Sequence, residues 1–272
     1  MTVEDRYAAR KVSSSKAGVD RATQRLAQGE YPGAFCKLFL HPRSRRRVQL
    51  VHVDGVGTKV VIAYLMTREH CGNPQDLWRD IAQDCLVMNI DDAACVGALG
   101  PHLFVDMVSR HSGLITDEWL PNLFNGFQDV AELFTRQGIK TTIVGGETAD
   151  VPNLVRTLDI MGTLYTDLRR DQVIDASRME PGDVIIGFSS TGQAKWETRP
   201  NSGIGSNGLT MAQHELLTHV YSNRYPESHA PDGDSGLNYC GRFMLESALF
   251  GDERFTVGEA LLSPTRTYAP LI

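Results

Sequence analysis

The chain carries a glycine turn at residues 54–59, Asp-Gly-Val-Gly-Thr-Lys, directly after the apolar run 48–53. Its order differs from that of a P-loop, which ends in Gly-Lys-Ser or Gly-Lys-Thr, and the spacing also fails the dinucleotide fingerprint. Glycine nevertheless lets backbone N–H groups approach an anion closely, and Asp54 offers a carboxylate to a cation. The turn is therefore compatible with a metal-bound phosphate, although Asp-Gly is also an ordinary turn dipeptide.

A second group of acids lies on a predicted helix at 77–96. At 100° per residue, Asp80, Asp84 and Asp91 lie within roughly 40° of one another, and Asp92 follows them. One interpretation is a solvated acidic face. The other is a Mg²⁺ site, because this hard cation takes oxygen ligands and bridges one or two carboxylates to a phosphate.

A second glycine turn, Gly145-Gly146-Glu147-Thr148, ends another predicted strand. Alone it is as compatible with a plain turn as with phosphate binding. Together with Asp54 and the acidic helix, it supports the hypothesis of a nucleotide–Mg²⁺ site more strongly than any one of the three does alone. His52 is interpreted as a strand histidine rather than a base, and no Ser-His-Asp order indicates covalent catalysis.

Strands are predicted at 48–53, 103–108, 140–146 and 155–165, and helices at 77–96 and 117–137. The segment MEPGDVIIGFSSTG at 179–192 predicts a domain boundary, because a Pro-Gly-Asp turn precedes the apolar strand DVIIGF. We therefore expect domains at 1–178 and 179–272. Two polar stretches, 192–205 and 222–241, are predicted to be surface loops, and the first could be a lid.

The bulk composition is that of a globular protein of 272 residues, 42% hydrophobic, with a formal net charge of −6. This charge does not favour a nucleic-acid partner. Arg45–Arg47 is a local exception, either a solvated loop or an anion-binding patch. Five cysteines without a Cys-x-x-Cys pair favour a reducing cytoplasm. No signal peptide and no bilayer-length apolar run are evident, so no membrane association is expected.

The motifs, taken together, resemble the phosphoribosylformylglycinamidine cyclo-ligases, also called aminoimidazole ribonucleotide synthetases. The collinear segments are KAGVD (16–20), VDGVGTK (53–59), DCLVMNIDDAACVGA (84–98), VGGETAD (144–150), PGDVIIGFSSTG (181–192), GSNGL (205–209) and LLSPTRTY (261–268). DGVGTK and GGETA are shared with a wider ATP-binding superfamily that includes thiamine-monophosphate kinase. The later segments point to the cyclo-ligase branch.

The resemblance implies a two-domain α+β fold, with a mixed or antiparallel sheet covered by helices on one face and an incomplete second α/β domain. It implies an enzyme that uses ATP and Mg²⁺ to close the imidazole ring of formylglycinamidine ribonucleotide through an imidate phosphate, as a homodimer. By the same resemblance, nucleotide phosphates would be bound by Asp54, Gly55, Gly57, Thr58, Lys59, Gly145, Gly146, Glu147 and Thr148; catalytic acids would be Asp84, Asp91 and Asp92; metal ligands would be Asp54, Asp84 and Asp91; and substrate contacts would come from Ser206, Asn207 and Gly208.

Three departures from the family pattern leave alternatives open. Asp91-Asp92 stands where the family has Asn-Asp, Gly205 stands where it has His, and the family continues beyond Ile272 into the rest of its second domain. The alternatives are another ATP-dependent enzyme of the superfamily, similar to thiamine-monophosphate kinase, and a non-catalytic module for nucleotide binding and dimerisation.

Overall fold

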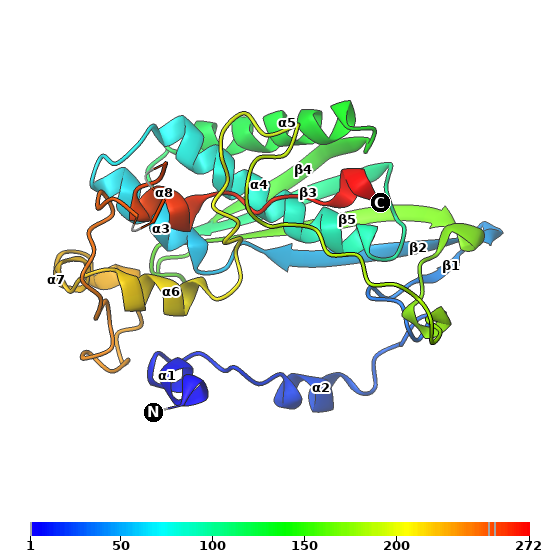
Figure 1. Cartoon of the computed structure of the whole chain (residues 1–272), viewed down its shortest axis with the longest axis horizontal. Coiled ribbons are helices and arrows are strands. Elements are labelled where there is room, and N and C mark those ends of the chain that lie inside the picture. Colours follow the sequence, from blue (N-terminus) through cyan, green and yellow to red (C-terminus); the bar gives the residue numbers. More distant parts are fainter. Residues whose placement is uncertain (1, 250, 253) are drawn as a thin grey trace.

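A five-stranded sheet forms the centre of the computed structural model, which describes residues 2–249, 251–252 and 254–272 (Figure 1). The strand order is β1-β2-β5-β3-β4. The strands are β1 (Phe39–His41), β2 (Ser44–Gly55), β3 (His102–Arg110), β4 (Thr141–Asp150) and β5 (Leu158–Arg169). Only β3 and β4 run parallel among these pairs, so the predicted mixed sheet is confirmed.

Three helices, α3 (Lys59–Arg68), α4 (Pro74–Ala94) and α5 (Leu120–Arg136), lie over one face of this sheet (Figure 1). The side chain of Asn73 caps α4 by accepting a hydrogen bond from the Gln75 N–H, with proline at the first helical position. Helices α4 and α5 pack closely at Gly126, where an added Cβ would lie 2.7 Å from the Arg79 Cα. Both helices predicted from periodicity are confirmed, each within three residues of its expected ends.

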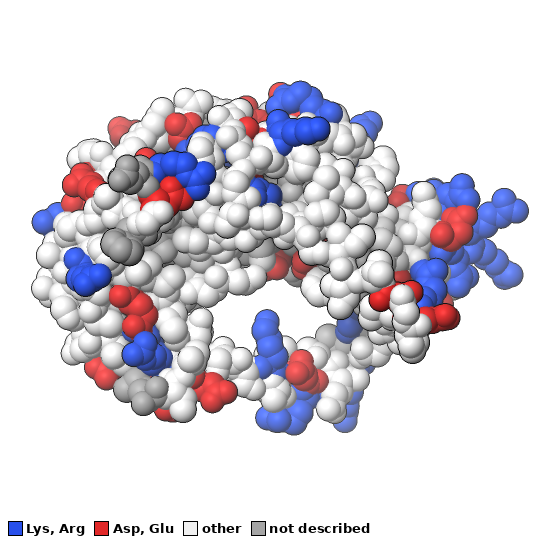
Figure 2. All heavy atoms as spheres, viewed as in Figure 1, with Lys and Arg blue, Asp and Glu red and all other residues white. Residues whose placement is uncertain are grey.

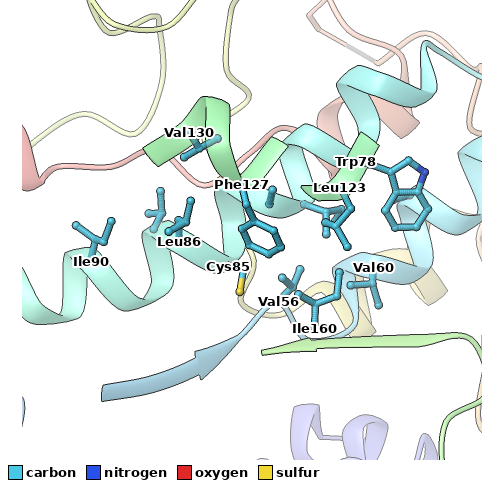
Figure 3. Close-up of a cluster of buried hydrophobic side chains, with 14 of the residues drawn as sticks. Val56, Val60, Trp78, Cys85, Leu86, Ile90, Leu123, Phe127, Val130 and Ile160 are labelled. Carbon is cyan, nitrogen blue, oxygen red and sulfur yellow. The ribbon is translucent and has the colours of Figure 1, made fainter. Parts of the chain in front are cut away.

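The hydrophobic core lies between the sheet and these helices (Figure 3). Apolar residues at helical spacing on α4 and α5 meet the strand residues that point to the same side. The labelled members include Trp78, Cys85, Leu86 and Ile90 from α4; Leu123, Phe127 and Val130 from α5; and Ile160 from β5. Each large side chain buried in this way stabilises the fold by about 1.5–3 kcal/mol, so this core holds α4 firmly against the sheet.

The opposite face of the sheet is apolar yet exposed. On β2, Val48 and Leu50 are buried under the helices, whereas Val51 and Val53 point away and are 67% and 56% exposed. Exposed apolar residues continue this face across the neighbouring strands at Leu103, Val105, Met107, Val144 and Met161. A contiguous apolar surface of this kind marks an interaction face.

Arg45–Arg47 lies in β2, next to the β1–β2 turn, so the predicted loop is wrong. Arg45 and Arg46 are exposed, and Arg47 forms an ion pair with Asp167. Figure 2 shows basic side chains gathered at this end of the molecule. A strand forms here because β5 pairs with β2 as far as Arg47.

Among the described residues of 179–272 the regular elements are helices, with only isolated β-bridges in place of the strands of the predicted α/β unit. These residues contain α6 (Leu209–Leu216), α7 (Val220–Arg224) and α8 (Val257–Leu262), while α1 (Val3–Ala9) and α2 (Ala17–Thr23) begin the chain. Within the described residues, DVIIGF at 183–188 pairs with no strand, and Ile185 is 100% exposed. The prediction of a buried strand here is wrong, because a strand requires a neighbour for its backbone groups. The domain boundary at 178/179 stays a prediction.

The two predicted surface loops are held to the body of the protein. Arg199 in the 192–205 stretch forms an ion pair with Asp80, and Arg266 binds Glu197 at 2.7 Å. The 222–241 stretch includes the end of α7 and the fully buried Tyr239. Among the helices of the described ranges, none is both long and apolar enough to cross a bilayer.

Candidate functional site

One row of residues crosses four strands at the helix-covered face of the sheet. In the strand register, Asp54 on β2 stands opposite Gly162 on β5, Gly162 opposite Asp106 on β3, and Asp106 opposite Gly146 on β4. Strands are spaced about 4.8 Å apart, so the backbones of Asp54 and Asp106 are roughly 9.6 Å apart. Both acids share the strand face of buried core residues, so the row directs two carboxylates toward the helices.

Helix α4 fixes the Asp54 end of this row. The Asp54 N–H donates to Asn89 Oδ1 at 3.1 Å, and Asn89 Nδ2 donates back to the Asp54 carbonyl at 3.2 Å. Asp54 Oδ1 accepts a hydrogen bond from the Gly55 N–H at 2.7 Å. A Cβ on Gly55 would lie 2.9 Å from the Ile160 carbonyl oxygen, so glycine is required where the turn leaves the strand.

His52, Asp54 and Asp92 form a cluster under the first residues of the turn. One ligand atom from each lies within 4.8 Å of the others, and His52 Nε2 is 2.9 Å from Asp92 Oδ2. This pair lacks hydrogen-bond alignment, and Nε2 is buried without a hydrogen-bond partner in the described part of the chain. Burial raises the pKa of Asp92, while the neighbouring His52 acts in the opposite direction. The cluster therefore offers nitrogen and oxygen donors to one cation.

The structure thus joins Asp54 to Asp92, but not to the other two acids predicted as metal ligands. The sequence interpretation of His52 as a strand residue is confirmed, since it lies in β2. The sequence reasoning did not predict that His52 belongs to a cluster with Asp54. The spacing His52-x-Asp54 could have indicated it, because residues two apart on a strand have side chains on the same face.

Asp84 instead lies in a fully buried polar network with Lys59. Its Oδ1 accepts from Lys59 Nζ at 3.0 Å, Ser206 Oγ at 2.9 Å and Thr265 N at 2.7 Å. Lys59 Nζ also donates to the Ser263 carbonyl oxygen. These contacts tie α3 and α4 to two distant segments. A phosphate role for Lys59 would require its ammonium group to leave this network, so that role stays a prediction.

Asp91 and Asp80 are also engaged within the chain. Asp91 accepts from Thr267 Oγ1 at 2.5 Å and from the Tyr268 N–H at 2.7 Å, and burial raises its pKa to about 6. Asp80 pairs with Arg199, and burial raises its pKa to about 7 despite that pairing. Asp80 and Asp84 are 3% and 0% exposed, so the interpretation of a solvated acidic face is wrong. Residues 263–268 cover it instead.

Asp106 is an acid that the sequence reasoning missed. It is 6% exposed, and its Oδ1 finds no hydrogen-bond partner among the residues described. Burial raises its pKa to about 6. A Cβ on Gly146 would lie 2.4 Å from Asp106 Oδ2, so this glycine of β4 packs closely against the carboxyl group. The signal was a single acid within the apolar strand LFVDMV, where a charge is costly unless it has a role.

The two predicted glycine turns flank opposite ends of the row. Gly57 has a φ of 65°, which favours glycine, and Thr58 and Lys59 begin α3. At the other end the predicted turn is wrong, because residues 145–148 pair with β3 inside the edge strand β4. Gly145, Gly146 and Glu147 are exposed there, with Thr148 half-buried. Phe104 and Asn89 fill the space above Gly162, between the two acids. The row is thus open at its ends rather than in the middle.

The predicted substrate loop meets the first turn. Gly208, with a φ of 79°, precedes α6, and Thr210 Oγ1 lies 2.5 Å from Thr58 Oγ1. Ser206 binds Asp84, as described above, and Asn207 lies between them in an exposed turn. A hollow of about 380 Å³ adjoins this junction, and its lining includes Lys11, Thr58, Arg156, Thr210 and His229.

Sequence comparisons identify proteins to which this chain is similar. The family described as "AIR synthase related protein, N-terminal domain" matches residues 39–165. The phosphoribosylformylglycinamidine cyclo-ligase of Methanosarcina mazei is 29% identical over 221 residues, which are 80% of this chain and 51% of that protein. The protein of the same name from Methanococcus maripaludis is 31% identical over 163 residues, 59% of this chain and 38% of that protein.

The chain spans about half the length of the curated relatives it matches. A solved structure of T. maritima PurL complexed with FGAR is 14% identical, with a TM-score of 0.44, and the match covers 67% of this chain and 26% of that one. A similarity at that level carries no structural argument. Residues 39–165 thus match the domain described as AIR synthase related, and the chain is similar to the phosphoribosylformylglycinamidine cyclo-ligases.

Proposed function

We propose that the chain functions as an ATP-dependent phosphoribosylformylglycinamidine cyclo-ligase in purine biosynthesis, in the cytoplasm. The observation that supports this most directly is the placement of Asp54, Asp92, Asp106 and Gly146 around one face of the sheet. Oxygen donors and glycine backbone occur together there, and the family motifs supply Asp54, Asp92 and Gly146. That combination suits a cation-bound polyphosphate.

The donor set fits a divalent cation. The carboxylates of Asp54 and Asp92 would hold it, and when bound it would neutralise charge on the phosphates. The Gly57 N–H group, with Thr58, would bind phosphate oxygens at one end of the row, while the Gly55 N–H holds the Asp54 carboxylate. Gly145–Thr148 would do so at the other end, beside Asp106.

The proposed reaction needs positioning more than a nucleophile on the protein. ATP phosphorylates the formyl-amide oxygen of formylglycinamidine ribonucleotide, and the neighbouring amidine nitrogen attacks that carbon. The amide oxygen then leaves as phosphate and the ring closes. We place the ribonucleotide in the hollow beside Thr58 and Thr210, where Lys11 and Arg156 suit its phosphate. Ser206–Gly208 would orient it.

We also infer a homodimer that forms through the open face of the sheet. Val51, Val53, Val105 and Met107 give that face a continuous apolar surface that water contacts in the single chain. A two-fold pairing would bury the same patch on both copies. The second copy of the chain would therefore bind at this face.

One observation favours the non-catalytic alternative. The exposed apolar run 184–188 pairs with no strand in the described structure, so the part of the chain that follows the sheet does not form the predicted second α/β unit. A non-catalytic module that binds nucleotide and dimerises would need only the row from Asp54 to Gly146 and the exposed apolar face of the sheet. No feature of the described site favours the alternative that resembles thiamine-monophosphate kinase over the cyclo-ligase.

The test measures ATP binding and turnover with the full chain. Titration calorimetry with ATP and a divalent cation should show binding, and incubation with formylglycinamidine ribonucleotide should yield the aminoimidazole product. Gly146→Ala should weaken ATP binding tenfold or more, because the added Cβ meets Asp106 at 2.4 Å. Gly18→Ala is the matched control, since its Cβ meets nothing within 4 Å.

Binding without product would overturn the cyclo-ligase proposal in favour of the module. Phosphorylation of thiamine monophosphate instead would indicate the kinase branch. Equal ATP affinities for Gly146→Ala and the unaltered chain would remove the β4 glycine turn from the site.

A further inference from the structure

The metal cluster contains a nitrogen donor, which an ordinary Mg²⁺ site does not need. His52 and Asp54 project from the same face of β2, and Asp92 reaches them from α4. Mg²⁺ prefers carboxylate, carbonyl and water oxygens, whereas imidazole suits first-row transition metals. The third ligand therefore changes which ion the site should prefer.

The geometry of His52 is that of a ligand rather than of a simple ion-pair partner. Its Nε2 lies 2.9 Å from Asp92 Oδ2 but is not aligned for a hydrogen bond, and it is buried without such a partner in the described residues. A cation bound by both atoms would give Nε2 the partner that it lacks. The ring nitrogen and the carboxylate oxygens thus converge on one position.

The distances are close to those of a bound ion. Two ligands that each lie about 2.1 Å from a metal are at most roughly 4.2 Å apart. The three ligand atoms lie within 4.8 Å of one another. The ligand atoms therefore need to move closer together by no more than about 0.6 Å to coordinate one ion. Rotation of the half-buried side chains of Asp54 and Asp92 can provide this movement.

Cys36 fixes the orientation and the tautomer of the imidazole. Its Sγ lies 3.2 Å from the Asp92 carbonyl oxygen, to which the thiol donates, and 3.7 Å from His52 Nδ1. Since the one thiol hydrogen is used on the carbonyl, sulfur is left to accept from Nδ1–H. This places the lone pair on Nε2, facing the cluster. Ligating histidines are commonly oriented in this way by a group on their other nitrogen.

We propose that His52, Asp54 and Asp92 form a binding site selective for a divalent transition-metal ion such as Mn²⁺, Co²⁺ or Zn²⁺ over Mg²⁺, with Cys36 as the residue that positions His52. Three protein ligands leave coordination positions open, as in catalytic rather than structural metal sites. Phosphate oxygens could occupy them. The inference rests on the proposed function for the ion's role, but not for its binding.

The test titrates metal-free protein with Co²⁺, in the absence of nucleotide, and follows visible absorption with Mg²⁺ as competitor. The unaltered chain should bind one Co²⁺ with ligand-field bands, and His52→Gln should lower the Co²⁺-over-Mg²⁺ affinity ratio tenfold or more. Gln keeps an oxygen donor and similar length, so Mg²⁺ affinity should change less than threefold. His41→Gln, at a half-buried histidine on β1, should change neither affinity.

Cys36→Ala provides an independent test that leaves all three ligands in place. It should lower Co²⁺ affinity by about 10–100-fold, as loss of a group that orients a ligand usually does. Circular dichroism would confirm that each variant is folded. If His52→Gln does not fold, Cys36→Ala decides the outcome.

Three results would overturn the inference. They are the absence of saturable Co²⁺ binding, a Co²⁺-over-Mg²⁺ ratio that His52→Gln leaves within a factor of two, and Co²⁺ affinity that Cys36→Ala does not alter. Failure of the cyclo-ligase assay would leave these measurements unaffected, because no nucleotide or substrate is present in them. The proposed function and the metal preference can therefore fail separately.

Discussion

Replacing Lys59 with Met separates two roles for this lysine, because the side chain keeps its length but loses its ammonium group. Lys59 and Asp84 both have side chains that are 0% exposed, and they are 3.0 Å apart. Without Lys59, Asp84 stays buried with only the hydrogen bonds from Ser206 and Thr265. Breaking one partner out of a buried pair costs about 3–5 kcal/mol.

That cost translates into a large change in thermal stability. For chains of about this size, 1 kcal/mol shifts the midpoint by about 2–4 °C, so Lys59→Met should lower it by roughly 6–20 °C. Adding Asp84→Asn should cost less than the sum of the two single changes, because the unpaired charge is then removed. Lys140→Met, at an exposed lysine, is the matched control and should shift the midpoint by less than about 2 °C.

The assay pairs thermal unfolding with ATP titration on the folded fraction. If Lys59 is an anchor, stability falls and the ATP affinity of the folded chain changes less than threefold. A midpoint within 2 °C of the unaltered chain, together with a tenfold or greater loss of ATP affinity, would refute the reasoning. Lys59 would then be the phosphate ligand that its motif predicts.

Two further predictions concern pH and assembly. Burial raises the pKa of Asp80 to about 7, so between about pH 4 and pH 7 the folded form holds a proton that the unfolded form releases. The resulting contribution to stability is full below about pH 4 and is lost as the pH rises to about 7. The unfolding midpoint of Asp80→Asn should therefore change less over that range than that of the unaltered chain. An equal pH slope in both proteins would contradict this assignment. On the open sheet face, Val51→Lys should convert the proposed dimer to monomer in sedimentation, whereas Val184→Lys should not; a monomeric unaltered chain would reject that interface.

The sheet and the two long helices were predictable from local pattern. The stripe on α5 and the alternation on β3 follow from periodicity alone, because each element buries one face. DVIIGF shows the limit of such reasoning. Its pattern predicts a strand, but pairing depends on a neighbouring strand, which local sequence does not specify.

The site was predictable only in part. The motifs indicated Asp54, Asp92 and the two glycine segments, but helical spacing placed Asp80, Asp84 and Asp91 on one face, which was interpreted as a metal site. That spacing says nothing about what covers the face. Residues 265 and 268, about 180 positions away, supply the donors that bury both acids. Strand register, which brings Asp106 opposite Gly146, was likewise beyond reach of the sequence.

The network around Asp84 also bears on how the chain is made. Thr265 lies 181 residues after the acid whose oxygen it binds. At a synthesis rate of about 5–20 residues per second, roughly 9–36 s separate the emergence of the two residues from the ribosome. During that interval Lys59 can already pair with Asp84, whereas the Thr265 donors do not yet exist. The helix beside the metal cluster therefore completes its hydrogen bonding only after residue 265 has been synthesised, and release of the nascent chain before that point would leave Asp84 without the Thr265 donors.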